Sequence, residues 1–108
     1  MKDGKNMVAL TNCIKRWLRH RQIDKTHPEA QLVMIAGEVG EIAKGLSKRD
    51  KQLTIDGIGN TYVALVALCG ALDLEIDECI YHAYKKIDDS KAKKVKMVDG
   101  FFGKEREL

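Results

Sequence analysis

Two glutamates three residues apart, Glu38 and Glu41, interrupt an apolar run over residues 32–43. On a helix, side chains at this spacing lie about one turn apart on the same face. Glu38 shares its stripe with Ile35 and Ile42, so at least one carboxylate is expected to point toward the core. Burying an unpaired carboxylate costs free energy, and two adjacent carboxylates repel each other. The pattern therefore predicts a cation between them, and Mg²⁺ is the divalent ion that best suits oxygen ligands.

A second pair of oxygen-bearing side chains lies near the start of the next predicted helix, at Asp56 and Asn60. Residues four apart share one face of a helix, so these two also point the same way. If the two helices pack antiparallel, all four side chains can converge on one spot. Such a site would suit one or two Mg²⁺ ions, with Mn²⁺ as a chemically similar substitute and water completing the coordination. The predicted metal ligands are Glu38, Glu41, Asp56 and Asn60.

Each of these residues also has an ordinary structural explanation. The glutamates could be helix charges that face solvent, and Asp56 could be an acidic residue favoured near a helix N-terminus. Asn60 could be a buried amide that joins two helices. Acidic groups gathered in a helical bundle are typical of metal-binding helices, so the combination favours the site.

The elements that would position these residues are helices. Apolar residues recur at helical spacing, and Thr26-His27-Pro28-Glu29 has the form of a capping box with proline in the first turn. These signals predict four helices with short connections, over about residues 7–22, 28–47, 53–72 and 76–91. An Asp99-Gly100 pair signals a hairpin in the tail. The predicted fold is therefore all-α, a four-helix bundle over residues 1–94 with a C-terminal hairpin or tail over residues 95–108.

The third predicted helix is apolar nearly all round between Thr61 and Ala71, which suggests burial on several sides. A chain of 108 residues forms one domain with only a modest core of its own. The sequence therefore predicts that a second subunit supplies part of the core, most simply in a two-fold dimer. A compact monomer is the alternative.

The composition is that of a soluble globular chain, with 44% hydrophobic and 32% charged residues. Cys13, Cys69 and Cys79 lack CxxC spacing and lie among apolar residues, which predicts buried free thiols in a reducing compartment. The first residues are polar rather than an apolar signal peptide, and the longest apolar run, residues 62–72, is too short to span a bilayer. The expected location is the cytoplasm, without a membrane partner.

The net charge of +3 is weak, so composition does not indicate nucleic-acid binding. The positive charge is concentrated near the C-terminus, at Lys85, Lys86, Lys91, Lys93, Lys94 and Lys96. These lysines could form a solvated helix end that suits the helix dipole, or a patch that faces phosphate groups. A small helical regulator that binds nucleic acid is the weakest interpretation, because no basic surface with interleaved aromatic residues is present.

Several motifs together resemble the MazG-like nucleotide pyrophosphohydrolases, most closely the short proteins carried by phages and prophages. They are Trp17 in the first predicted helix, Pro28-x-x-Gln31, Glu38-Val39-Gly40-Glu41-Ile42, Ile58-Gly59-Asn60, and Leu72-Asp73-Leu74-Glu75 before a helix that ends in lysines. The resemblance covers about residues 8–94. It implies an all-α fold that assembles as dimers or dimers of dimers. It also implies Mg²⁺-dependent cleavage of nucleoside or deoxynucleoside triphosphates to the monophosphate and pyrophosphate.

The signature of that family is Glu-x-x-Glu in one helix and Glu-x-x-Asp in the next. The first half is present as Glu38 and Glu41, which the resemblance implies are the catalytic residues. In the second half, Gly57 stands at the glutamate position, with Asp56 one residue earlier, and Asn60 stands at the aspartate position. A catalytically impaired protein that binds or senses nucleotides is therefore the alternative function.

The resemblance also implies how the substrate is held and cleaved. A metal-activated water would attack phosphorus in line, and Glu41 or Glu38 would accept its proton. The implied substrate-binding residues are Trp17, by stacking on the base, Gln31, by hydrogen bonding, and Lys86, Lys93 and Lys94, by neutralising phosphate charge. Trp17 could instead belong to the core, and the lysines could simply be exposed.

Overall fold

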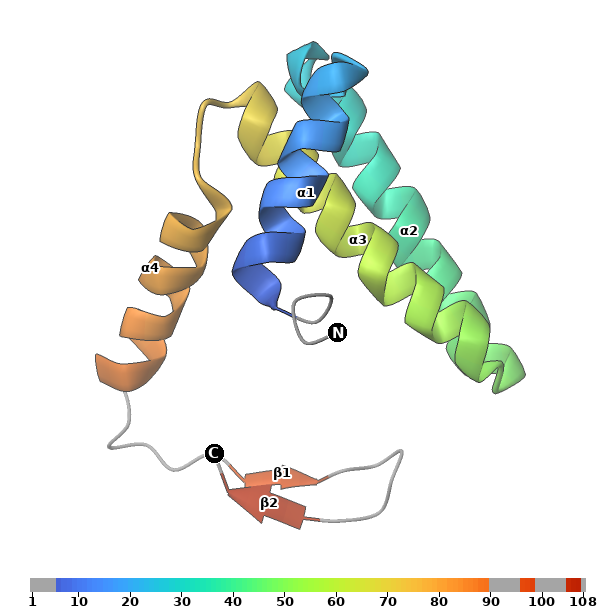
Figure 1. The fold of residues 1–108 in the computed structure, drawn as a ribbon. Helices are drawn as coiled ribbons and strands as arrows, with labels where there is room; N and C mark the ends of the chain where they lie inside the picture. The colour runs from blue at the N-terminus through green and yellow to red at the C-terminus, as the bar shows by residue number, and fades with distance from the viewer. Residues whose placement is uncertain (1–5, 90–95, 99–104, 108) are drawn as a thin grey trace. The chain divides into compact units, whose positions relative to one another are not determined.

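The computed structural model describes residues 6–89, 96–98 and 105–107 (Figure 1). Its helices are α1 (Met7–His20), the short 3₁₀ helix η2 (Ile23–Lys25), α2 (Pro28–Lys48), α3 (Lys51–Ala71) and α4 (Ile76–Asp89); its strands are β1 (Lys96–Val98) and β2 (Glu105–Glu107). The four α-helices confirm the predicted all-α class. The chain divides into two units, Met1–Ile76 and Asp77–Leu108.

Both ends of helix α1 are determined by local interactions, a side-chain cap at the start and the backbone conformation at the end. The Asn6 side chain accepts a hydrogen bond from the backbone N–H of Ala9 at 3.0 Å, which satisfies a donor that the first helical turn leaves unpaired. Gln22 has a φ of 56°, in the left-handed region that a right-handed helix cannot continue. The helix therefore ends at His20, slightly before the predicted boundary at residue 22.

Helix α2 begins with Pro28 at a first-turn position, as predicted. A proline fits there because the first backbone N–H groups have no partner within the helix. The predicted capping box is wrong, since the cap residue is His27 and its side chain forms no capping hydrogen bond. Thr26 instead donates its hydroxyl to the carbonyl oxygen of Ile23 at 2.7 Å, so it stabilises the turn before the helix.

A two-residue connection reverses the chain between α2 and α3. Arg49 has a φ of 53°, and the N–H of Asp50 donates to the carbonyl of Gly45 at 2.8 Å, which ends α2 at Lys48. The Asp50 side chain then caps α3 by accepting a hydrogen bond from the N–H of Leu53 at 3.0 Å. This tight turn sends α3 back antiparallel to α2 (Figure 1).

Two glycines let α2 and α3 approach each other closely. A Cβ atom built on Gly45 would lie 2.8 Å from the backbone nitrogen of Thr54. One built on Gly57 would lie 2.8 Å from Cγ1 of Ile42. Contacts this short force the neighbouring atoms to shift, so glycine at both crossing points favours the close approach.

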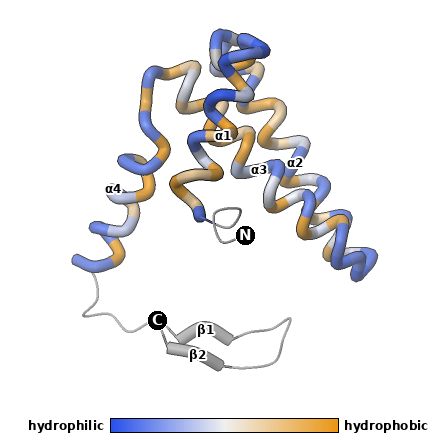
Figure 2. Tube along the Cα trace, in the orientation of Figure 1, coloured by the Kyte–Doolittle hydropathy of each residue, from blue (hydrophilic) through white to orange (hydrophobic). Residues whose placement is uncertain are grey.

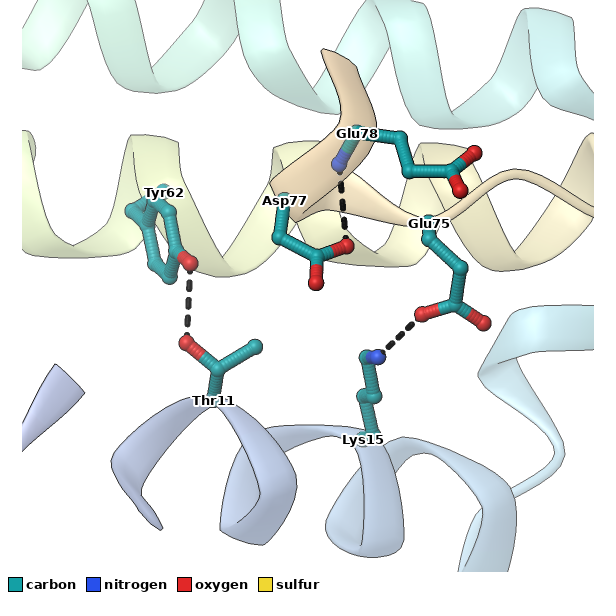
Figure 3. Close-up of polar contacts among 6 residues, drawn as sticks. All are labelled: Thr11, Lys15, Tyr62, Glu75, Asp77 and Glu78. Atoms are coloured by element: carbon teal, nitrogen blue, oxygen red, sulfur yellow. Dashed lines mark hydrogen bonds and ion pairs between the residues drawn. The ribbon is translucent and has the colours of Figure 1, made fainter. Parts of the chain in front are cut away.

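The core of the first unit lies where α1 and η2 pack on the C-terminal half of α3. Its buried members are Leu18, Val66, Ala67, Cys69 and Ile76, with Ile14, Ile23 and Tyr62 packed against them. The hydroxyl groups of Thr11 and Tyr62 share a hydrogen bond of 2.8 Å at the edge of this core (Figure 3). Lys15 on α1 also forms an ion pair with Glu75, in the connection that follows α3 (Figure 3).

All three cysteines are free thiols. Cys69 is buried, as predicted, but the prediction of burial is wrong for Cys13 and Cys79, which are exposed. Successive side chains on a helix point about 100° apart, so apolar neighbours in the sequence do not place a residue on the buried face.

Hydrophobic residues recur along α2 and α3 (Figure 2), and many of them are exposed in the single chain. Only 28% of the most apolar stretch of α3 is buried. By length and composition alone, the whole of Lys51–Ala71 is long and apolar enough to cross a membrane, which the run of residues 62–72 is not. One such helix does not distinguish a membrane span from the core helix of a soluble protein, so the cytoplasmic location stays a prediction.

The second unit contains most of α4 and the two short strands. The carboxylate of Asp77 accepts a hydrogen bond from the backbone N–H of Glu78 at 2.9 Å (Figure 3), and acidic residues suit the first turn of a helix. Strands β1 and β2 pair antiparallel, with Met97 opposite Arg106. The Asp99–Gly100 pair, on which the predicted turn was placed, lies outside the described residues.

Candidate functional site

Glu38 lies on the stripe of α2 that packs against α3. Ile35, Glu38 and Ile42 are all partly buried, and Ile42 contacts Gly57 across the helix pair. The predicted placement of one glutamate on a packed face is therefore confirmed. Glu41 is also partly buried, one turn further along the same helix.

Glu38 lines a small cavity of about 160 Å³ between α1, α2 and α3. Three more of the residues predicted to form the site, Trp17, Gln31 and Asn60, line the same cavity. The rest of its wall is apolar, formed by Leu18, Ile23, Met34, Val63, Ala64 and Ala67. The structure thus gathers four predicted site residues from three helices around one cavity with few polar groups.

An apolar groove of about 430 Å³ lies next to this cavity, between α1 and α3. Trp17, Asn60 and Val63 line both the cavity and the groove. The other walls of the groove are Leu10, Cys13 and Ile14. Its volume is within the range typical of small-molecule sites, and its lining combines apolar side chains with one amide.

Trp17 is 47% exposed, so it is not a core residue. The guanidinium carbon of Arg21 lies 4.3 Å from the centroid of its ring, in a cation–π contact. Sequence reasoning missed Arg21. The four-residue spacing between Trp17 and Arg21 could have identified it, because side chains at i and i+4 meet on a helix.

Gln31 is 3% exposed, and besides lining the cavity it forms hydrogen bonds that stabilise the fold. Its amide nitrogen donates to the carbonyl oxygen of Ile23 at 3.3 Å and to the hydroxyl of Thr26. These bonds tie η2 to α2. In a hydrogen bond between Gln31 and a ligand, the amide oxygen would therefore be the acceptor.

Asp56 and Glu41 do not line this cavity. Asp56 is exposed, and its carboxylate accepts a hydrogen bond from the side chain of Gln52 at 2.9 Å. Asp56 lies one turn before Asn60 on the same face of α3, outside the residues that line the cavity. The cavity thus brings together two of the four predicted metal ligands, Glu38 and Asn60. The described residues contain no group of three His, Cys, Asp or Glu side chains placed to hold a metal ion.

The predicted phosphate-binding residues include three lysines of the C-terminal segment. Lys86 is exposed on α4, in the second unit. Lys93 and Lys94 lie outside the described residues.

The donor set around the cavity suits Mg²⁺ only together with oxygens from a ligand. Glu38 offers a carboxylate and Asn60 an amide oxygen, and both line the same cavity. Mg²⁺ commonly takes one or two protein carboxylates and completes its octahedron with substrate phosphates and water. A nucleotide-bound Mg²⁺ therefore fits these side chains better than an ion held by the protein alone.

No protein-family model, curated protein or solved structure matches the chain. The resemblance to MazG-like proteins therefore stays a prediction.

Proposed function

We propose that this chain is a Mg²⁺-dependent nucleoside triphosphate pyrophosphohydrolase, similar to the MazG-like enzymes, which yields a nucleoside monophosphate and pyrophosphate. The observation that supports this best is the cavity between α1, α2 and α3. An aromatic ring, two amides and a carboxylate converge on it, at Trp17, Gln31, Asn60 and Glu38. These groups match the parts of a nucleotide: a flat base, hydrogen-bonding edges and metal-bound phosphates.

In this proposal Glu38 and Asn60 hold the metal–nucleotide complex through their oxygens. When bound, Mg²⁺ supplies Lewis-acid polarisation of the phosphate chain and of a coordinated water. The water oxygen attacks the α-phosphorus in line, and the bond from that phosphorus to the bridging oxygen breaks as pyrophosphate leaves. A carboxylate, Glu41 or Glu38, accepts the proton of the attacking water.

The groove between α1 and α3 supports the placement of the base. It is apolar, shares Trp17, Asn60 and Val63 with the lining of the Glu38 cavity, and is large enough for a heterocyclic ring system. Base–aromatic stacking is tolerant of base identity because every base has a π-face.

The proposal includes a homodimer, or a dimer of dimers. Exposed apolar residues on α2 recur at spacings of four and three, at Leu32, Ala36, Val39, Ala43 and Leu46. This stripe differs from the one that packs on α3, so α2 has a second apolar face. Exposed Ile55 and Ile58 on α3 add to the uncovered surface. Soluble monomers rarely expose so much contiguous apolar surface, which supports a second copy of the chain as its cover.

Nucleotide binding without turnover is the second candidate. It is favoured by the amide at Asn60 and by the hydrogen bond that engages Asp56 with Gln52 outside the cavity. Both reduce the negative charge available to hold a metal ion. The resulting protein would sense nucleotides rather than hydrolyse them.

A screen of ribo-, deoxy- and modified nucleoside triphosphates with Mg²⁺ would test both candidates. Products are separated by chromatography, so that pyrophosphate release is distinguished from release of a single phosphate. A monophosphate with stoichiometric pyrophosphate is the result expected of the hydrolase. Saturable nucleotide binding without any product would instead establish the second candidate, and the absence of binding would reject both.

A further inference from the structure

The cavity around Glu38 contains a carboxylate but no cationic side chain among the described residues that line it. A triphosphate carries several negative charges, which Glu38 would repel in the absence of a compensating cation. One divalent ion offsets only part of that charge. A phosphate-binding site of this kind needs a further cationic donor near its rim.

Arg21 places a guanidinium group beside the cavity. Its Cζ atom lies 4.3 Å from the centroid of Trp17, which lines both the cavity and the groove. The backbone is fixed as well, since the N–H of Arg21 donates to the carbonyl of Trp17 at 3.3 Å. A guanidinium that lies on an aromatic face keeps its N–H groups directed outward in its own plane, where they can bind an anion.

Three other cationic side chains of α1, those of Lys15, Arg16 and Arg19, contact other groups or line another cavity. Lys15 pairs with Glu75, and Arg16 donates to the thiol of Cys13 at 3.5 Å. Arg19 lines a separate cavity of about 180 Å³ near the end of α3. Within the described part of the chain Arg21 forms no ion pair with a carboxylate, so its donors are available for a ligand.

From these relationships we infer that Arg21 is a substrate-binding residue that contacts the phosphate chain of the nucleotide. The inference rests on the proposed function and adds to it a specific cation. Trp17 has two roles in this arrangement: one face of its ring orients the guanidinium, and the ring also forms a wall of the groove for the base. The fork of N–H groups on Arg21 suits two phosphate oxygens at once, which a lysine cannot match.

Ligand titrations with Arg21→Gln, Arg21→Lys and the matched control Arg19→Gln test this inference. Trp17 is the only tryptophan in the chain, so its fluorescence reports directly from the site. Calorimetry provides a second measurement that does not depend on the ring. The probes are a non-hydrolysable α,β-methylene triphosphate analogue with Mg²⁺, inorganic triphosphate with Mg²⁺, and the corresponding nucleoside. Far-UV circular dichroism checks that each variant is folded.

Arg21→Gln should weaken binding of the analogue and of inorganic triphosphate by about tenfold or more, the effect of losing a charge-assisted hydrogen bond. Nucleoside binding should be unchanged, Arg21→Lys should be intermediate, and Arg19→Gln should bind all three probes like the unsubstituted chain. Equal losses in Arg21→Gln and Arg19→Gln, or no loss in Arg21→Gln, would overturn the inference alone. A folded, unsubstituted chain that binds no triphosphate would overturn the proposed function as well.

Discussion

Ile42 on α2 contacts Gly57 on α3 so closely that a Cβ atom at position 57 would lie 2.8 Å from Cγ1 of Ile42 and 3.1 Å from its backbone nitrogen. Position 57 is where the MazG signature has a glutamate. Any glutamate side chain begins with a Cβ atom, so it could enter only if α2 and α3 separated. The chain therefore uses this position for helix packing, and in the proposed metal–nucleotide complex the oxygen ligands would come from other positions.

The first prediction follows from that contact. Gly57→Ala should lower the free energy of unfolding by about 1 kcal/mol, because overpacking outweighs the gain in helix propensity. Gly59→Ala is the matched control: a Cβ atom there would meet nothing within 4 Å in the single chain, so helix propensity should raise stability by about 1 kcal/mol. Urea unfolding followed by circular dichroism measures both. Equal effects of the two substitutions would contradict the close helix contact.

The second prediction concerns the carboxylates. Glu38→Gln, and likewise Glu41→Gln, should abolish Mg²⁺-dependent turnover, with a loss of at least about 10²-fold, because each change removes a group proposed to bind the metal or accept the proton. The fold should be kept or become more stable, since an amide is less costly than a carboxylate in a partly buried site. Steady-state kinetics and thermal unfolding test the two parts. Unchanged turnover in both variants would reject these assignments.

The third prediction compares the contributions of Asn60 and Asp56 to Mg²⁺ binding. Asn60→Asp adds a carboxylate to the cavity that Glu38 lines, so the Mg²⁺ concentration needed for half-maximal nucleotide binding or turnover should fall, on the order of tenfold. Asp56→Asn should have little effect, because Asp56 is exposed and bonded to Gln52. Mg²⁺ titrations at a fixed nucleotide concentration measure this requirement for both variants and for the unsubstituted chain. A large effect of Asp56→Asn would show that this residue is a metal ligand in the nucleotide complex.

The fold was predictable from the sequence to the extent that local signals determine it. Helical periodicity gave the four helices, and Pro28 marked the start of α2. The prediction of a capping box was wrong because the Thr26 hydroxyl donates to the carbonyl oxygen of Ile23, earlier in the chain, and does not cap α2. This hydrogen bond depends on the η2 turn, which the local sequence pattern predicts only weakly.

The candidate site was predictable in its parts but not in its assembly. Helical spacing placed Glu38 on the packed face of α2 and pointed to Asn60 on α3, and the resemblance pointed to Trp17. All three residues line the same cavity. Asp56 shares a face of α3 with Asn60 but lies one turn earlier, and it does not line the cavity that Glu38 and Asn60 line. Where such a cavity forms depends on how closely the helices approach. Interhelical distance is a tertiary property, and no pattern within one helix specifies it.

The fourth prediction uses the hydrogen bond between Thr11 and Tyr62 (Figure 3). Tyr62→Phe should lower the free energy of unfolding by about 1 kcal/mol, because Thr11 is buried and its hydroxyl loses its partner. Thr11→Val combined with Tyr62→Phe should cost less than the sum of the single changes, since neither partner is then left unsatisfied. The control is Glu75→Gln, which breaks the partly exposed ion pair to Lys15 and should cost less than about 1 kcal/mol. Strict additivity in the double variant would contradict a direct bond.

The fifth prediction tests the proposed dimer at the exposed stripe of α2. Val39 lies on this stripe and is 50% exposed, while Val33 is 71% exposed on the same helix but points away from the stripe. Val39→Glu should convert a dimer into monomers, because it places a charge in an apolar interface, whereas Val33→Glu should leave the mass unchanged. Sedimentation equilibrium over a range of protein concentrations measures the mass of each. If the unsubstituted chain is a monomer throughout that range, the proposed assembly is wrong; if both variants dissociate alike, the interface does not follow this stripe.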